Sequence, residues 1–252
     1  MSWMDGANAI QSKNHNLFFG ATGADQYWGN DVCLLDASQG NNGDTSAIDY
    51  STFHTTPLFA GSAKLSNTRV KFGNASFFAS NIPGILTVTY DASKRLDGFD
   101  FTIEVWLNPV ITKGAIIKIG ENAGPRYFCW LGYGLAGNNG KYSAWLNFDG
   151  AAWQVQIDEA GTSVVNGQWH HFVLMRNGAT VYMLVDAVLL GQANVGASNL
   201  DPAYTIMPQF GLFNTDASQN YFADQFRVTR SIARYNPAGG YALPSAPFPH
   251  QF

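Results

Sequence analysis

Two adjacent histidines, His170 and His171, are the residues whose types most directly suggest chemistry. Imidazoles bind metals and move protons near neutral pH. The pair follows Gly167-Gln168-Trp169 and lies within residues 169–175, a segment predicted to be a strand. Because neighbouring residues of a strand point to opposite faces of the sheet, the two rings do not readily chelate one ion. We therefore interpret the pair as structural.

Other catalytic patterns are missing from the sequence. It contains no Ser-His-Asp spacing, phosphate-binding loop or dinucleotide fingerprint. Glu104 stands alone on its predicted strand, and Asp158-Glu159 precede Ala160-Gly161, which reads as a turn. A glycosidase needs two carboxylates across the scissile bond, and no strand offers such a pair at alternating positions. We predict that the protein is not an enzyme and assign it no catalytic residue.

Composition excludes further classes of function. Of 252 residues, 14 are Lys or Arg and 18 are Asp or Glu, so charged residues make up 13% of a chain with a net charge of −4. This composition lacks the excess of positive charge that binding to nucleic acid or to anionic membranes requires. Apolar residues reach 46%, enough to build a core. The sequence shows no signal peptide and no apolar run of the roughly 20 residues that a membrane span needs, so we expect synthesis in the cytoplasm.

The elements that position these side chains are predicted to be strands, because apolar and polar residues alternate with period two. The clearest case is residues 101–107, predicted to be half-buried. Residues 142–148 and 153–157, separated by Asp149-Gly150, are predicted to form a hairpin. Further strands are expected at residues 32–35, 69–72, 85–89, 115–119, 169–175, 181–185, 207–213 and 221–229.

Short strands with regular turn residues between them predict an all-β fold, a two-sheet antiparallel sandwich. We divide the chain into an N-terminal arm or edge strand (1–30), the sandwich (31–235) and a proline-rich, extended C-terminal tail (236–252). Residues 1–28 either pack on their own sandwich or reach a neighbouring subunit. Cys33 and Cys129 belong to no metal or redox motif and are either buried free thiols or a long-range disulfide.

Several motifs in register resemble the laminin-G-like, concanavalin A-like lectin jelly rolls, and the resemblance covers residues 31–249. The motifs are D-F-T-I-E-x-W at 100–106, G-x-W-H-H at 167–171, V-D-A in place of V-D-G at 185–187, and the strand F-A-D-Q-F-R-V-T at 222–229. The closing elements, A-R-Y at 233–235 and P-S-A-P-F-P at 244–249, are most similar to versions from tailed bacteriophage genomes. Ala187 departs from the family glycine, so that turn is expected to carry strain or another geometry.

The resemblance implies a structural calcium ion held by carboxylates and carbonyl oxygens on loops. Candidate ligands crowd one glycine-rich loop, and one further aspartate matches the family's aspartate on a late strand. They are Asp36, Asn41, Asn42, Asp44, Asp49 and Asp224. The alternative interpretation is that these residues only form turns and cap strands.

The resemblance also implies glycan binding, which uses exposed aromatic faces beside amide or carboxylate groups. One region of the sequence has this mixture: Trp130, Tyr133, Asn138, Asn139, Tyr142, Trp145, Asp149 and Trp153. Trp106 and Trp145 lie on the polar faces of their predicted strands, so we expect at least one to be exposed. The alternative is that these aromatic residues fill the core or an interface.

Together these features predict a non-enzymatic protein on the surface of a tailed-phage virion, either a capsid decoration or a head-fibre protein. The alternatives are a tail-associated receptor-binding module and a jelly-roll carbohydrate-active enzyme. No repetitive stem typical of a tail fibre is present in the sequence. The expected partners are other virion proteins and cell-surface glycans, not nucleic acid or membrane, and by analogy a homo-oligomer, a trimer, is expected.

Overall fold

A computed structural model describes residues 25–79, 84–88, 94, 96, 98, 100–111, 114–120, 127–133, 141–147, 155–159, 164, 166–198, 208–211, 219–238 and 240–251. Within these ranges the regular structure consists of strands and one short 3₁₀ helix, η1 (Trp28–Asn30). The predicted all-β, two-sheet antiparallel sandwich is confirmed. None of the described helical structure is long and apolar enough to span a bilayer.

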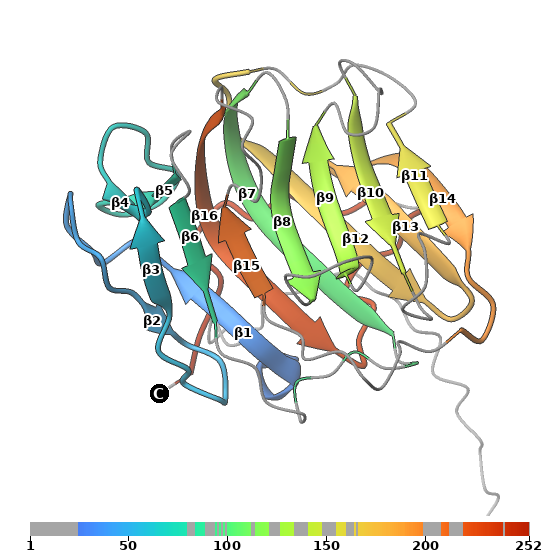
Figure 1. Cartoon of the computed structure of the whole chain (residues 1–252). Helices are drawn as coiled ribbons and strands as arrows, with labels where there is room; N and C mark the ends of the chain where they lie inside the picture. Colours follow the sequence, from blue (N-terminus) through green and yellow to red (C-terminus); the bar gives the residue numbers. More distant parts are fainter. Residues whose placement is uncertain are drawn as a thin grey trace, which may run out of the picture.

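Two antiparallel sheets face each other (Figure 1). The first, sheet A, has the order β14-β13-β12-β7-β16-β1-β2, and β4 and β5 attach beside β16. Its strands are β1 (Asp31–Asp36), β2 (Ile48–Asp49), β4 (Lys64–Ser66), β5 (Ser76–Ala79), β7 (Phe101–Ile111), β12 (His170–Asn177), β13 (Thr180–Val185), β14 (Val188–Asn194) and β16 (Gln219–Arg230).

The second sheet, sheet B, lies in front in Figure 1 and has the order β11-β10-β9-β8-β15-β6-β3. Its strands are β3 (Leu58–Gly61), β6 (Gly84–Thr87), β8 (Gly114–Gly120), β9 (Tyr127–Tyr133), β10 (Tyr142–Leu146), β11 (Val155–Asp158) and β15 (Pro208–Gly211). The hairpin predicted around Asp149-Gly150 exists as the β10–β11 pair, with Leu146 opposite Val155. Its connection is therefore longer than the dipeptide, which lies outside the described residues.

Alternate residues of the strands fill the space between the sheets. Ile103 and Val105 of β7 and Leu174 of β12 meet Ala144 and Leu146 of β10 in one buried cluster. Cys33 belongs to the same cluster and is a free thiol, whereas the side chain of Cys129, in β9, lies outside the described residues. The inward-facing positions predicted for 101–107 are thus correct.

The outer face of sheet A is also covered. Ala233 and Tyr235 cover Val173, Met175 and Leu184. Phe248 covers Leu34 and Tyr50. Residues 101–109 of β7 are consequently buried on both faces, so the half-buried assignment of this strand is wrong.

Residues 69–72, predicted as a strand, form an irregular loop instead. The Phe72 amide donates to Asp224 Oδ2 at 3.1 Å, and Arg69 Nη1 donates to Asn108 Oδ1 at 2.6 Å, so the segment is tied to side chains of sheet A and not to a strand backbone. Gly73 follows with φ of 66°, and a Cβ there would come within 2.3 Å of the Ser38 carbonyl oxygen. Only glycine fits this close approach.

Candidate functional site

An outward-facing tryptophan, Trp145, lies near one edge of sheet B. Its neighbours on β10, Ala144 and Leu146, point into the core, so Trp145 points to the opposite face and is half-buried. The strand register places Trp145 opposite Trp130 of β9 on one side and opposite Gln156 of β11 on the other. Three adjacent strands therefore bring two tryptophans and an exposed amide to consecutive register positions.

Polar groups lie next to Trp145 on the same face. Ser143 Oγ donates to Asp158 Oδ1 at 2.7 Å. Gln156 Nε2 donates to both carboxylate oxygens of Asp158, at 3.0 and 2.9 Å. These bonds fix the orientation of the carboxylate and the amide beside the indole. An aromatic surface with ordered polar neighbours is the arrangement that sugar rings require, because their C–H patches stack on rings while their hydroxyls need acceptors and donors. We call this surface the Trp145 face.

The predicted aromatic residues divide into three groups. Trp145 is partly exposed, whereas Tyr142 is 1% exposed and packs on Phe172 with ring centroids 5.0 Å apart, so its assignment as a sugar contact is wrong. Trp106 is 3% exposed because the 69–72 loop covers it, with Phe72 edge-on at 6.1 Å. The remaining predictions concern residues whose side chains lie outside the described part: Trp130, Tyr133, Asn138, Asn139, Asp149 and Trp153.

The predicted calcium ligands do not converge on one point among the described residues. Asp49 Oδ1 accepts the amides of Leu34 and Ser51 at 2.9 and 3.0 Å, and Asp44 Oδ2 accepts the Asn41 amide at 2.8 Å. In the described part of the chain, no three His, Cys, Asp or Glu side chains are grouped to hold a metal ion. These bonds close local turns and tie Asp49 to β1, and the calcium site stays a prediction.

Asp36 and Asp224 do lie close together. The Gln225 amide nitrogen bridges them, 2.6 Å from Asp36 Oδ1 and 3.4 Å from Asp224 Oδ1. Burial, with the charge of Asp36, raises the pKa of Asp224 to about 7, against hydrogen bonds from Phe72 and Gln225 that lower it. Asp36 and Asp44 both line a pocket of about 260 Å³ beside the loop that connects β1 to β2.

His170 and His171 point in opposite directions, as the strand geometry requires. His170 Nδ1 lies 2.6 Å from Asp186 Oδ2. His171 Nδ1 lies 2.8 Å from the Tyr241 hydroxyl, and its Nε2 lies 3.2 Å from Glu104 Oε2. Both rings are buried, at 5% and 0% exposure. Each ring is held by a different acid, which agrees with a structural role.

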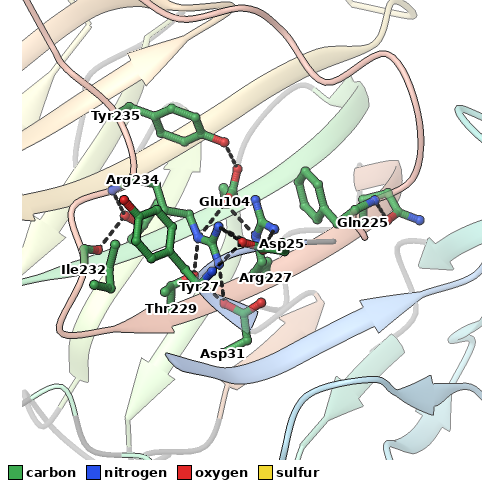
Figure 2. Close-up of polar contacts among 12 residues, drawn as sticks. Asp25, Tyr27, Asp31, Glu104, Gln225, Arg227, Thr229, Ile232, Arg234 and Tyr235 are labelled. Carbon is green, nitrogen blue, oxygen red and sulfur yellow. Dashed lines mark hydrogen bonds and ion pairs between the residues drawn. The ribbon is translucent and has the colours of Figure 1, made fainter. Parts of the chain in front are cut away.

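Sequence reasoning missed a buried ion cluster on the outer face of sheet A, formed by Asp25, Asp31, Glu104, Arg227 and Arg234 (Figure 2). Arg227 contacts Glu104 Oε1 at 2.7 Å and Asp25 Oδ2 at 2.6 Å. Arg234 contacts Asp25 Oδ2 at 2.9 Å and Asp31 Oδ1 at 2.7 Å. The cluster joins the N-terminal segment, β1, β7, β16 and the C-terminal segment.

Neighbouring hydroxyl groups complete the hydrogen bonding of this cluster. Thr229 Oγ1 donates to Asp31 Oδ1 at 2.6 Å, and the Tyr235 hydroxyl donates to Glu104 Oε2. Burial alone would raise the pKa of Glu104, but Arg227, His171 and Arg234 hold it well below its usual range. The five charged side chains are at most 4% exposed, so no substrate reaches them. In the sequence, the residues that could have indicated this cluster are the arginines of the R-V-T and A-R-Y motifs together with Glu104.

Comparisons with known proteins agree with this architecture. Comparison with curated protein sequences finds no match. Among solved structures, the binding domain of Paraclostridial Mosquitocidal Protein 1 is similar, with a TM-score of 0.64 and 13% identity over 83% of this chain and 51% of that one. The binding domain of botulinum neurotoxin DC is similar in complex with SialylT (TM-score 0.60, 13% identity, 82% and 50% coverage) and in complex with rat synaptotagmin II (0.62, 12%, 82% and 50%).

At this identity the likeness shows a shared fold, and the chain spans about half the length of these binding domains. All three neighbours are binding domains, not catalytic ones. The sequence itself gives a more specific result, because the Laminin_G_3 model matches residues 86–222. That match spans more than half of the sequence, so the chain belongs to this family of the concanavalin A-like lectin/glucanases superfamily.

Proposed function

We propose that this protein is a non-enzymatic glycan-binding protein on the surface of a tailed-phage virion, a capsid decoration or head-fibre protein. The Trp145 face is its sugar-contacting surface. The observation that carries the glycan part is the position of Trp145, which is half-buried, points away from the core and lies opposite Gln156, whose amide is bonded to Asp158.

Three further observations support binding over catalysis. Glu104, the acid that stood alone in the sequence, is enclosed by Arg227 and His171 and cannot approach a glycosidic bond. Asp158 is the acid fixed beside Trp145 by described hydrogen bonds, whereas glycoside hydrolysis uses two carboxylates on opposite sides of the bond. The solved neighbours are binding domains, and one was captured with the glycan SialylT.

A glycan array tests the sugar-binding part of the proposal. We expect the wild-type protein to retain a subset of glycans and Trp145→Ala to lose them, because removing the indole removes the stacking surface. Leu58→Ala is the matched control, since Leu58 is 55% exposed on β3 at the other edge of sheet B. If Trp145→Ala binds as the wild type does, or if no glycan is retained at millimolar concentration, the Trp145 face is not a sugar site.

The virion part rests on the closing motifs at 233–235 and 244–249 and is tested by counting copies. Quantitative mass spectrometry of purified phage particles, calibrated against the major capsid protein, should find hundreds of copies. A handful of copies would replace the decoration role with a receptor-binding role on the tail, which the likeness to toxin binding domains favours as the second candidate. Absence from the particle would contradict both.

The low content of charged residues suggests the kind of contacts by which the protein would be attached to the particle. With 13% charged residues, contacts made by apolar packing and hydrogen bonds depend little on salt. We propose attachment as a homo-oligomer, a trimer at local three-fold positions of the capsid. Release from particles by moderate salt would contradict this mode of attachment.

A further inference from the structure

The pocket beside the β1–β2 connection is a second, separate candidate for ligand binding. Its volume is about 260 Å³, slightly below the roughly 300–1,000 Å³ of pockets that enclose drug-sized ligands, which suits a ligand of monosaccharide size. The pocket combines acids, an amide, a hydroxyl and a phenol with an apolar floor. It is lined by Asp36, Gln39, Gly40, Asp44, Ser46, Ala47, Ile48, Tyr50 and Leu65.

Backbone hydrogen bonds hold the wall of this pocket in place. The Gly43 amide donates to the Leu65 carbonyl at 2.9 Å, and the Leu65 amide donates to the Asp44 carbonyl at 2.7 Å. The Gly40 amide closes a turn onto Ala37 at 3.0 Å. On the opposite side, the Tyr50 ring is fixed by stacking on His250 with centroids 4.0 Å apart. The pocket is therefore formed before any ligand binds, which lowers the entropic cost of binding.

Charge is the property that distinguishes the pocket. None of the described residues that line it is a Lys, Arg or His. Asp36 is 6% exposed and bonds to Ser38 and Gln225, but no described Lys, Arg or His side chain forms an ion pair with it. Asp224, behind Gln225, is a second buried carboxyl group, but its pKa of about 7 keeps it largely protonated at pH 6, so it adds little charge to the pocket. At the rim, Asp44 Oδ2 holds Asn41, and no described residue donates to Asp44 Oδ1.

Buried carboxylates are normally paired with a cation, because an isolated buried charge is costly. Here the negative field also acts on neighbours: burial and then the charge of Asp36 raise the pKa of Tyr50. A ligand that brings one positive charge into this pocket would compensate Asp36. The pocket also offers hydrogen-bonding groups, Gln39 and Ser46, and an apolar surface from Ile48 and Leu65.

We propose that this pocket binds an amino sugar, a hexose-sized ligand with a free ammonium group. The ammonium group pairs with Asp36 and Asp44, the ring hydroxyls bond to Gln39 and Ser46, and the apolar face of the ring lies against Ile48 and Leu65. A lysine side chain would use the two carboxylates but leave the amide, the hydroxyl and much of the volume unused. For a metal ion, the described residues supply no group of three His, Cys, Asp or Glu side chains.

Amide-proton NMR titration of the ¹⁵N-labelled protein tests this inference, with D-glucosamine as the probe at pH 6. We expect glucosamine to shift the amide signals of residues 39–48, with a dissociation constant about tenfold lower than those of D-glucose and N-acetylglucosamine, which lack the positive charge. Butylamine, which carries an ammonium group on an alkyl chain, should bind about tenfold more weakly than glucosamine.

Two variants make the result specific to the pocket. Asp44→Asn removes a half-exposed charge and should weaken glucosamine binding at least about fivefold. Asp100→Asn is the control, because Asp100 accepts the Gly178 amide and does not line the pocket, and it should leave glucosamine binding unchanged. Ser46→Trp, at an exposed lining position, should block the pocket without touching the core. Equal affinity for glucose, equal affinity for butylamine, or displacement of glucosamine by calcium would each overturn the proposal. Trp145→Ala tests the other surface, so failure of the Trp145 face and failure of this pocket can be told apart.

Discussion

Some residues of this protein adopt unfavourable conformations that contacts with neighbouring side chains compensate. The clearest case is the turn between β13 and β14. Asp186 and Ala187 have φ of 50° and 65°, the left-handed region that costs a non-glycine residue about 1 kcal/mol or more. Ala187, which replaces the glycine of V-D-G, therefore adopts the glycine-like turn geometry with backbone strain. Asp186 stabilises the turn by bonding to His170 Nδ1 at 2.6 Å and to the His171 amide at 2.8 Å.

Ala187→Gly should therefore stabilise the protein. Glycine relieves the strain at φ of 65° but loses more backbone entropy on folding, so we expect a net gain of up to about 1 kcal/mol. Urea unfolding followed by tryptophan fluorescence measures it. Asp186→Gly is the control: it relieves similar strain but removes the bonds to His170 and His171, and it should destabilise. A loss of stability in Ala187→Gly would show that the turn is not strained.

At the scale of elements, the C-terminal segment acts as a cover for sheet A. Phe248 is 1% exposed, its ring lies 4.0 Å from the Arg227 guanidinium, and its amide donates to Gln225 Oε1 at 2.7 Å. It thereby shields the buried ion cluster from water. Shielding matters because the attraction between charges grows as the surrounding dielectric constant falls.

Phe248→Ala should cost about 3 kcal/mol of unfolding free energy, since it opens a cavity and admits water to Arg227. Leu243→Ala is the matched control on the same segment; Leu243 is 41% exposed, and we expect a change within about 0.5 kcal/mol. Chemical denaturation of the two variants checks both values. Equal effects would mean that the segment does not cover the sheet through Phe248.

Contacts between distant parts of the chain, such as this cover, could not be predicted from the sequence. Alternation located long strands such as β7 and β12 and the side of each that faces the core, because a period of two follows from strand geometry. It could not show that Glu104 and Trp106 are buried, since the residues that cover them come from far along the chain. The strands β2 and β4, of two and three residues, are too short for alternation to appear. Of the candidate sugar contacts, Tyr142 failed because aromatic residues serve the core equally well.

For the whole molecule, the two sheets have different roles. The outer face of sheet A is closed by the terminal segments and carries the buried ion cluster, whereas the outer face of sheet B presents Trp145 and Gln156. Removing one partner of a buried ion pair costs about 3–5 kcal/mol, so the cluster makes folding depend on both ends of the described chain. The two proposed binding surfaces lie outside this closed face, one on sheet B and one at the edge of sheet A near β2.

Two buried acids have pKa values shifted in opposite directions, lowered for Glu104 and raised for Asp224, and both shifts make stability depend on pH. Glu104 has a pKa below its usual range, so its contribution is present above the unfolded pKa of about 4.5 and is lost as pH falls below that value. Asp224 has a pKa of about 7 in the folded protein against 3.8 unfolded. Between those two values the folded state holds a proton that the unfolded state has released, so stability falls as pH rises.

We therefore expect the unfolding free energy to decrease between pH 4 and pH 7, with Asp224 contributing a slope of about 1.4 kcal/mol per pH unit. In Asp224→Asn that contribution disappears, so the variant should show a flatter profile over this interval even if its overall stability drops through the altered bond to Phe72. Urea unfolding at half-unit pH steps gives both slopes. Parallel profiles for wild type and variant would show that Asp224 is already ionised at pH 4 and that its burial does not hold the proton.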